Sequence, residues 1–187
     1  MVCRPLHVKN YHSVAFFDAS IRKFDSPFIS SIVLYFTKNK NFNNMDNYQI
    51  KIVKESFALI AKIPAETVGE LFYNKLFEIA PKVMPMFGKA NMPEQSRKLI
   101  SMLAFIINRL EKLDTIIEEV AKLAKMHLKY GVKPYHYQPV GEALLWTLEE
   151  GLGKNWNSEL SSAWSLCYAT LSGAMIKACA ESIEIEK

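Results

Sequence analysis

The chain has 187 residues, half of them hydrophobic and only seven of them glycine, which is enough for one sizeable hydrophobic core plus an appendage but not for two full enzyme domains. This composition excludes a fibrous, low-complexity or disordered protein. The formal charge of +4 is carried by residues 1–44, where six lysine and arginine residues outnumber two aspartates, whereas residues 45–187 are neutral. Because of that balance, the main body of the chain is not expected to bind nucleic acid.

The first 44 residues differ in kind from the rest of the chain. They are rich in aromatic side chains and show no sustained helical or strand-like periodicity. A second methionine, Met45, then stands directly before Asp46 and Asn47, a good helix-capping pair. We interpret residues 1–44 either as an accessory extension or, preferably, as an upstream stretch translated from the wrong start codon, and we expect the functional domain to span residues 45–187.

Signals for export or for a membrane span are weak. The apolar run 29–36 is interrupted by two serines and is much shorter than the ~20 residues of a membrane helix. Basic residues precede this run, as in a signal peptide, but no small-residue cleavage pattern follows it. The three cysteines, Cys3, Cys167 and Cys179, are too few and too scattered for a disulfide framework. We therefore expect a cytoplasmic protein without a membrane span.

From Asn47 onward, apolar residues recur at steps of three and four with no strand-like alternation, which predicts an all-α domain. Proline is tolerated in the first turn of a helix, so Pro64 is expected to open the second helix, which Pro81 then ends. Gly131 and Pro134 are expected to break the chain after the fourth helix. The apolar stripes of the predicted helices are Ile50–Ile60, Val68–Ile79, Leu99–Leu110, Ile116–His127, Val140–Leu148 and Leu160–Ala178.

A few side chains on these helices are able to carry chemistry. His127 lies on an apolar stripe and should face the core, where a lone histidine is more often a hydrogen-bonded core residue than a metal ligand. Tyr73 lies beside the apolar face of the second helix, with Gly69 one turn earlier. Because glycine costs a helix ~1 kcal/mol relative to alanine, we expect another helix to cross closely there. Gln95 and Ser96 open the third helix and point either into a cavity or into water.

Several segments, taken together in order along the chain, carry a resemblance to a known family. They are Leu71–Phe77, Met86–Phe87, Gln95–Leu99, Lys125–Val132, Tyr137–Leu145 and Ala163–Trp164. No single segment is diagnostic, but their order and spacing are specific. Residues 47–187 resemble a bacterial single-domain globin, similar to the haem domain of flavohaemoglobins, the lineage whose longer members carry a flavin reductase. The resemblance implies a globin fold, in which helices pack around a haem pocket.

The resemblance implies that haem b is the cofactor and that His127 is the proximal ligand of its iron. Phe87 matches the phenylalanine that packs on the haem face in this family. Tyr73 and Gln95 match the distal pair of these bacterial globins, and Leu99 would line the distal pocket.

The resemblance implies less specific roles for several other residues. Gly69 would let the second and third helices cross closely. Lys98 would pair with a haem propionate, although a solvated surface lysine is nearly as common an outcome at such a position. His136 is not at a ligand position, and we expect it to cap or hydrogen-bond in the corner after Gly131. The positions that match the proximal side of the pocket are Val132, Tyr137 and Val140.

The resemblance also implies a mechanism. Histidine ligation from one side leaves the sixth iron position open to dioxygen, nitric oxide or carbon monoxide. Tyr73 and Gln95 would donate hydrogen bonds to dioxygen, which takes on negative character, in a pocket of low dielectric. Slower oxygen escape favours attack by nitric oxide, which family members can convert to nitrate. Because the chain stops at Lys187 without room for a flavin domain, we expect a separate reductase as electron donor.

One departure from the family weakens the enzyme interpretation. Relatives with strong peroxide or nitric oxide chemistry tend to carry a glutamate on the last helix that hydrogen-bonds the proximal histidine. Cys179 stands near that position, and Glu181, two residues on, falls on a different face of the helix. Without a carboxylate the imidazole is less anionic and pushes less electron density to the iron. Robust dioxygenase activity is therefore in doubt, while reversible gas binding is unaffected.

Three alternatives to a nitric oxide dioxygenase stay open at the level of the sequence. The first is an oxygen- or haem-binding protein without turnover. The second is a gas sensor, which would need an output partner. The third is a haem-free helical bundle that uses its apolar stripes for a protein contact.

Overall fold

The computed structural model describes residues 45–185, except for the side chains of Leu113, Asp114, Ile117 and residues 181–185. The interpretation of residues 1–44 lies outside the described part of the chain, and the domain boundary at Met45 stays a prediction.

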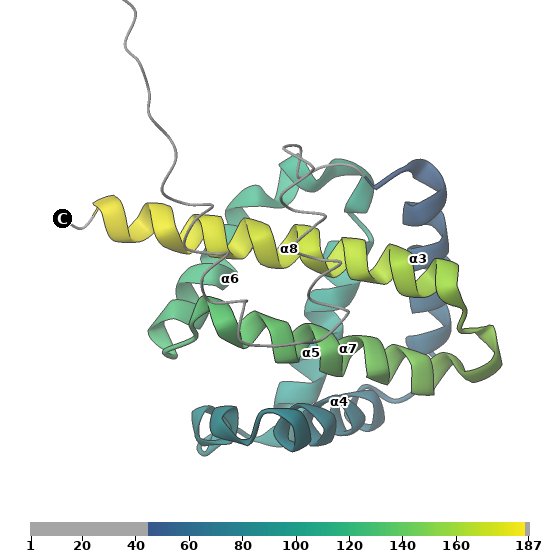
Figure 1. Ribbon diagram of the computed structural model, residues 1–187, viewed down its shortest axis with the longest axis horizontal. Coiled ribbons are helices and arrows are strands. Elements are labelled where there is room, and N and C mark those ends of the chain that lie inside the picture. The colour runs from purple at the N-terminus through teal and green to yellow at the C-terminus, as the bar shows by residue number, and fades with distance from the viewer. Residues whose placement is uncertain (1–44, 186–187) are drawn as a thin grey trace, which may run out of the picture. The chain divides into compact units, whose positions relative to one another are not determined.

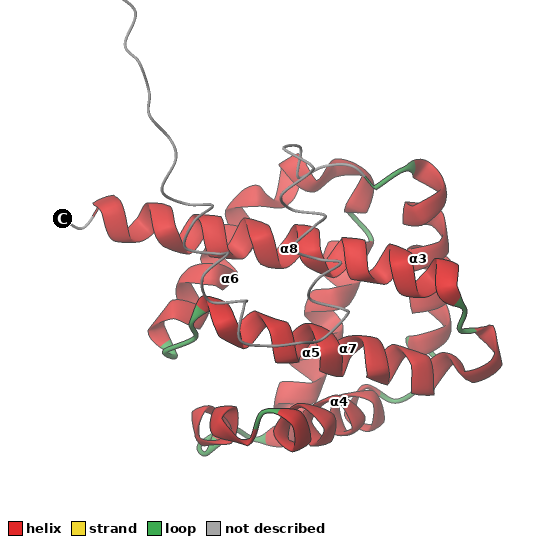
Figure 2. Ribbon diagram, in the orientation of Figure 1, coloured by secondary structure: helices red, strands yellow, loops and turns green. Residues whose placement is uncertain are grey.

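The described part is built from helices, as expected, and contains no strand (Figure 2). Four short 3₁₀ helices, η1 (Pro81–Phe87), η2 (Leu110–Ile116), η3 (Pro134–His136) and η4 (Gly153–Asn155), connect the longer ones. The α-helices are α3 (Asn47–Ile60), α4 (Ala65–Ile79), α5 (Met92–Ile107), α6 (Ile117–Lys129), α7 (Tyr137–Leu152) and α8 (Ser158–Ile185).

Local capping chemistry explains where these helices begin. The Asp46 side chain accepts a hydrogen bond from the backbone N–H of Gln49, and the Gln49 side chain accepts one from the backbone of Asp46, which completes a capping box. The predicted capping role of Asp46 is confirmed. Asn91 caps α5 in the same way, by accepting from the backbone of Glu94.

The third predicted helix is shorter than its apolar stripe. It ends at Ile107, and Leu110 belongs to η2 instead, so the prediction that one helix runs through Leu110 was wrong. The backbone leaves helical geometry inside η2, at Lys112 (φ −136°, ψ 50°). Leu110 is nevertheless buried, because a 3₁₀ turn continues the same spacing closely enough to keep the stripe on the core side.

The helices pack in two crossing layers around one core. Figure 1 shows α7 and α8 running alongside each other, with α5 crossing behind them and α3 at the end where α8 begins. α4 packs against both α5 and α7, and α6 packs against α8. In the core, Trp164 of α8 is 1% exposed, and its indole N–H donates to the hydroxyl of Ser56 on α3 at 2.9 Å. This bond ties the first described helix to the last.

The crossing of α4 and α5 depends on Gly69. A Cβ atom added at this position would lie 2.2 Å from the Cβ of Ser96 and 2.7 Å from its Cα. The prediction that Gly69 permits a close crossing is confirmed. The contact fixes the spacing between the helix that carries Tyr73 and the helix that carries Gln95.

Replacement of Gly69 by alanine is expected to lower the free energy of unfolding by about 1–3 kcal/mol, because the new methyl group meets the Cα and Cβ atoms of Ser96, which can move only with the backbone of α5. Urea denaturation followed by circular dichroism measures the change. Gly88→Ala is the matched control, since its Cβ approaches no described atom more closely than 3.4 Å. Unchanged or increased stability of Gly69→Ala would contradict the assigned role.

Candidate functional site

Tyr73 occupies a buried position on α4, with only 5% of its surface exposed. Burial raises the pKa of Tyr73 to about 12, and a hydrogen bond with the Gln95 side chain partly opposes this rise. The phenol is therefore neutral at physiological pH and keeps its proton for donation. The two residues that the sequence suggested as a distal pair are brought together by the α4–α5 crossing.

Aromatic rings surround the Tyr73 side chain. The helix η1 places Phe87 edge-to-face against Tyr73, with ring centroids 5.3 Å apart. Phe77, one turn further along α4, stands 5.4 Å from Phe87 and 6.0 Å from Tyr73. Phe72 adds a further ring contact at 5.0 Å. We call Tyr73, Gln95, Phe77 and Phe87 the distal cluster, which combines one polar pair with an apolar wall.

Lys98 and Leu99 lie on α5, three and four residues after Gln95. Leu99 is half-buried and packs against the core. Lys98 is exposed, and its ammonium nitrogen lies 2.7 Å from a carboxylate oxygen of Glu94. Hydrogen bonding from Lys98 lowers the pKa of the Glu94 carboxyl. The structure thus places Lys98 in a surface ion pair, and its role toward a propionate stays a prediction.

His127 lies in the last turn of α6 and is half-buried. Its Nδ1 lies 2.9 Å from the carbonyl oxygen of Leu123. A carbonyl oxygen can only accept, so Nδ1 carries the proton and donates it, which leaves the lone pair of Nε2 available for a metal. A carbonyl-oriented imidazole of this kind is the usual arrangement of metal-binding histidines.

The chain leaves α6 directly after His127 in a tight C-terminal motif. Gly131 has a positive φ of 79°, and its N–H donates to the Leu128 carbonyl while the N–H of Val132 donates to the His127 carbonyl. This pair of bonds is a Schellman motif, which favours glycine at the left-handed position. It places half-buried Val132 just beyond His127. His136 accepts from the Lys133 backbone N–H through Nδ1 at 3.0 Å, which confirms its expected role in the corner.

Tyr137, the first residue of α7, has its ring stacked on His127, with centroids 6.4 Å apart and an interplanar angle of 21°. Its hydroxyl oxygen is buried and has no hydrogen-bond partner among the described residues. Burial raises the pKa of Tyr137 to about 12, and the proximity of Cys179 contributes to the rise. Val140, one turn along α7, is half-buried against the core. The backbone of Tyr137 is fixed separately, because its carbonyl accepts from the hydroxyl of Tyr168 at 2.5 Å.

Cys179 of α8 faces the same region. Its sulfur lies 3.4 Å from the carbonyl oxygen of Ala124, one turn before His127 on α6. Burial raises the pKa of the Cys179 thiol, so this side of the pocket has a neutral group where a carboxylate would bring a charge. The side chain of Glu181 lies outside the described residues. We call His127, Tyr137 and Cys179 the proximal cluster.

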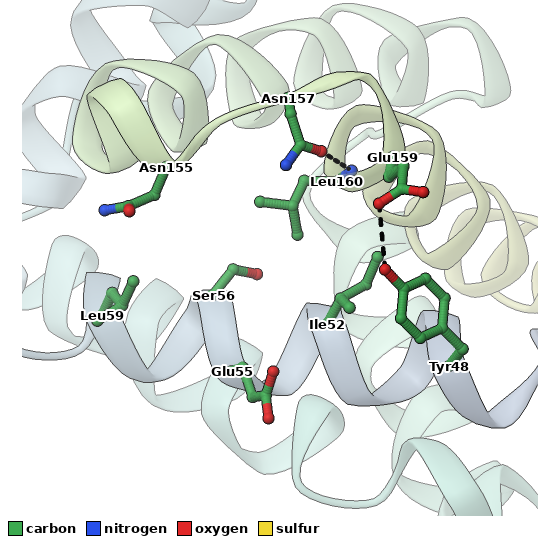
Figure 3. Close-up of a pocket in the computed structure, with 9 residues that line it drawn as sticks. All are labelled: Tyr48, Ile52, Glu55, Ser56, Leu59, Asn155, Asn157, Glu159 and Leu160. Carbon is green, nitrogen blue, oxygen red and sulfur yellow. Dashed lines mark hydrogen bonds between the residues drawn. The ribbon is translucent and has the colours of Figure 1, made fainter.

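A separate open cleft of about 340 Å³ lies between α3 and the start of α8 (Figure 3). Several of its polar groups bond to one another: the Tyr48 hydroxyl donates to Glu159 at 3.1 Å, and the Asn157 side chain accepts from the Leu160 backbone N–H. None of the candidate residues lines it. The lining residues are Tyr48, Ile52, Glu55, Ser56, Leu59, Asn155, Asn157, Glu159 and Leu160.

Comparison with known proteins decides the family. The family model described as Globin matches residues 70–175, more than half of the chain. The chain belongs to the globin family. This globin is 27% identical to a bacterial globin from Campylobacter jejuni of known structure, with a TM-score of 0.66 over 74% of this chain and 99% of that one. A hexacoordinated haem protein from an anhydrobiotic tardigrade shares the fold, with a TM-score of 0.65 at 11% identity over 74% of this chain and 97% of that one.

Two relatives have functional names. A flavohemoprotein from Bacillus subtilis (strain 168) is 26% identical over 71% of this chain, and the globin spans only 33% of the length of that relative. A protein from Gossypium hirsutum named as an anaerobic nitrite reductase is 31% identical, over 72% of this chain and 92% of its own length.

Family membership makes haem iron the cofactor of this globin and diatomic gases its ligands. The donor set fits that group. Within the described residues, no three His, Cys, Asp or Glu side chains gather at one place. The free Nε2 of His127 and the apolar wall at Phe87 match a haem group. None of the described helices has the length and apolarity needed to cross a membrane.

The structure also adds residues that the sequence did not single out. Phe77 joins the distal cluster, although its only sequence signal was its place in the Leu71–Phe77 segment. Tyr168 anchors the start of α7, and a Cβ at Gly141 would lie 2.5 Å from its ring. A glycine inside a helix at position 141 was the one available signal for that contact.

Proposed function

We propose that this globin is a cytoplasmic protein that binds dioxygen at a haem iron held by His127 and converts nitric oxide to nitrate with electrons from a separate reductase. The observation that supports this most is the buried Tyr73 hydroxyl, which interacts with the half-buried Gln95 side chain and is packed against the Phe87 ring. Such a pair has no evident structural use at the crossing of two helices. It suits a pocket that must hold a polarised small ligand away from water.

On the proximal side, the residues of this chain hold and orient the imidazole. The Leu123 carbonyl fixes the tautomer of His127, and the Tyr137 ring lies nearly parallel to the imidazole. Ala124 and Cys179 join α6 to α8 next to it. A haem held by His127 would supply an iron centre that binds a diatomic gas.

On the distal side, the residues supply protons for hydrogen bonding and exclude water. The Tyr73 hydroxyl is kept protonated by burial and donates toward the ligand position, while the Gln95 amide orients the hydroxyl and offers a second donor. Phe77, Phe87 and Leu99 form the dry wall that keeps the local dielectric low and strengthens these bonds.

Aerobic consumption of nitric oxide tests this proposal. Purified protein reconstituted with haem is mixed with NADH and a flavoprotein reductase, and the disappearance of nitric oxide and formation of nitrate are measured. We expect stoichiometric nitrate that depends on dioxygen, and a Tyr73→Phe variant that is at least about tenfold slower. Tyr48→Phe, which alters an exposed tyrosine of α3, is the matched control. Gas binding without nitrate formation would reject the enzymatic part of the proposal.

Reversible gas binding without turnover is the second candidate function, and Cys179 favours it. The Cys179 thiol is hydrogen-bonded to the Ala124 carbonyl and carries no negative charge that would interact with the His127 imidazole. The imidazole therefore donates less electron density than one paired with a carboxylate.

Replacement of Cys179 by glutamate is expected to lower the midpoint potential of the haem by about 40 mV, equivalent to about 1 kcal/mol for one electron. The new carboxylate would lie near the unpartnered Tyr137 hydroxyl, which would donate to it. Spectroelectrochemical titration measures the potential, and nitric oxide consumption is expected to rise as the potential falls. Cys179→Gln is the matched control, with a similar shape and no charge. Equal potentials in the two variants would show that charge at position 179 does not reach the histidine.

A further inference from the structure

The outward face of α6 carries a row of lysines. Lys122, Lys125 and Lys129 follow one another at steps of three and four, so they share one face of the helix, and all three are exposed. We call them the lysine ridge. His127 lies two residues from both Lys125 and Lys129, which directs it to the opposite side of the same helix.

The three ridge lysines lack counter-ions among the described side chains, unlike the paired lysines of α3, α4 and α5. Lys54 of α3 pairs with Glu111, Lys75 of α4 with Glu78, and Lys98 of α5 with Glu94. None of the three ridge lysines makes an ion pair with a side chain that the structure describes. The acidic residues of α6, Glu118 and Glu119, lie in its first turn, so Lys125 and Lys129, two to three turns further on, leave the second half of the helix with unpaired positive charge and a local positive potential.

Large apolar side chains stand exposed beside the lysine ridge. Met126 is 51% exposed and Tyr130, the C-cap residue of α6, is 67% exposed. Tyr135 in the corner that follows is 60% exposed. Methionine and tyrosine are enriched at protein interfaces relative to the remaining surface, so lysines surrounding such side chains indicate a contact surface rather than a purely solvated helix face.

The position of this surface fits electron entry. A single helix, about 10 Å across with its side chains, separates the lysine ridge from the Nε2 atom of His127. The hydrogen bond from His127 to the Leu123 carbonyl links the imidazole to the backbone of that helix. An electron delivered at this face has one helix to cross before it reaches the proximal ligand.

We propose that the lysine ridge, with Met126 and Tyr130, is the docking site for the acidic surface of a one-electron flavoprotein that reduces the haem. The inference rests on the proposed function, because it specifies where the separate reductase binds. Opposite charges accelerate encounter, and the exposed methionine and tyrosine supply the apolar contact at the centre of a transient interface.

Stopped-flow reduction of the full-length ferric protein by reduced flavodoxin, used as an acidic one-electron probe, tests the docking site. The test variant is Lys125→Glu with Lys129→Glu. The control variant is Lys62→Glu with Lys154→Glu, which has the same net charge and also changes two exposed lysines. These lysines follow the ends of α3 and α7, where Gly151 approaches Ile60. In Figure 1 these helix ends are remote from α6. At low ionic strength we expect about a tenfold slower rate for the test variant and less than about a twofold change for the control.

Three further measurements make the result decisive. The difference between the variants should vanish near 1 M salt, where the Debye length is ~3 Å. Calorimetric titration with oxidised flavodoxin should show weaker binding to the test variant alone. A milder double variant, Lys125→Gln with Lys129→Gln, should be reduced by flavodoxin about threefold more slowly than wild type. Dithionite should reduce this variant as fast as wild type, which would exclude a damaged haem pocket.

Equal losses in the test and control variants, or a wild-type rate that is independent of salt, would overturn the docking site. The outcome is separable from that of the proposed function. If flavodoxin reduces the protein in a ridge-dependent way but no nitric oxide is consumed, the docking site stands and the dioxygenase proposal fails.

Discussion

A His127→Gly variant is expected to bind haem more than about 100-fold more weakly than wild type, since even outer-shell changes at metal sites cost about 10- to 100-fold. The variant loses the Nε2 donor that the Leu123 carbonyl leaves free. The remaining pocket keeps its apolar walls, so weak haem binding should persist, and added imidazole should restore a ligated spectrum. Haem titration followed by the Soret band measures both effects.

His136→Gln is the control for this prediction. His136 is also a half-buried histidine, but its Nδ1 accepts from the Lys133 backbone N–H and helps to form the corner before α7. Burial lowers the pKa of His136, and its replacement should leave haem affinity unchanged. If His136→Gln loses haem while His127→Gly retains it, the assignment of the proximal ligand is wrong.

A Tyr73→Phe variant is expected to release dioxygen about 10- to 100-fold faster, because a hydrogen bond to a charged or strongly polarised acceptor contributes about 1.5–3 kcal/mol. Phenylalanine retains the ring contacts with Phe72, Phe77 and Phe87, so the change removes the donor and little else. Laser photolysis or stopped-flow displacement of dioxygen by carbon monoxide measures the rate.

The pH dependence of the same rate gives a second test. Burial raises the pKa of Tyr73 to about 12, so the hydroxyl should remain a donor, and oxygen dissociation should stay flat, from about pH 6 to pH 10. A raised pKa means that the folded state favours the neutral phenol. Its contribution to stability is therefore complete below the ordinary pKa of about 10 and is lost as the pH rises through about 12. If the dissociation rate already increases with pH before about pH 9, the distal role of Tyr73 is contradicted. A rate that Tyr73→Phe leaves unchanged would contradict it as well.

Much of the local structure was readable from the sequence because it depends on near neighbours. Asp46 and Gln49 form a capping box within one turn, and Gly131 ends α6 through bonds between residues close in the chain. The apolar stripes correctly placed Trp164 and Leu144 in the core. At Leu110 the apolar stripe correctly predicted a buried side chain but wrongly predicted an α-helix. Periodicity indicates which side chains face the core, not whether the backbone stays α-helical.

Only part of the candidate site could be predicted from the sequence. Resemblance to a family suggested His127, Tyr73 and Gln95, and periodicity placed His127 on the core side. The stacking of Tyr137 on His127 and the contact of the Cys179 thiol with the Ala124 carbonyl each join groups from different helices. No pattern within one segment encodes such distances.

By itself, then, the sequence determined the helical class, the helix boundaries that rest on local caps, and the neutral charge of residues 45–187. Only the tertiary structure decided that Gln95 reaches Tyr73, which requires Gly69 and Ser96 to bring two helices into close contact. It also decided that the ridge lysines of α6 have no counter-ions among the described side chains, while Lys54 of α3 has one in Glu111. The physical reason is the same in both cases: hydrogen bonds and ion pairs between helices depend on how the helices cross, and the crossing is set by packing over the whole core.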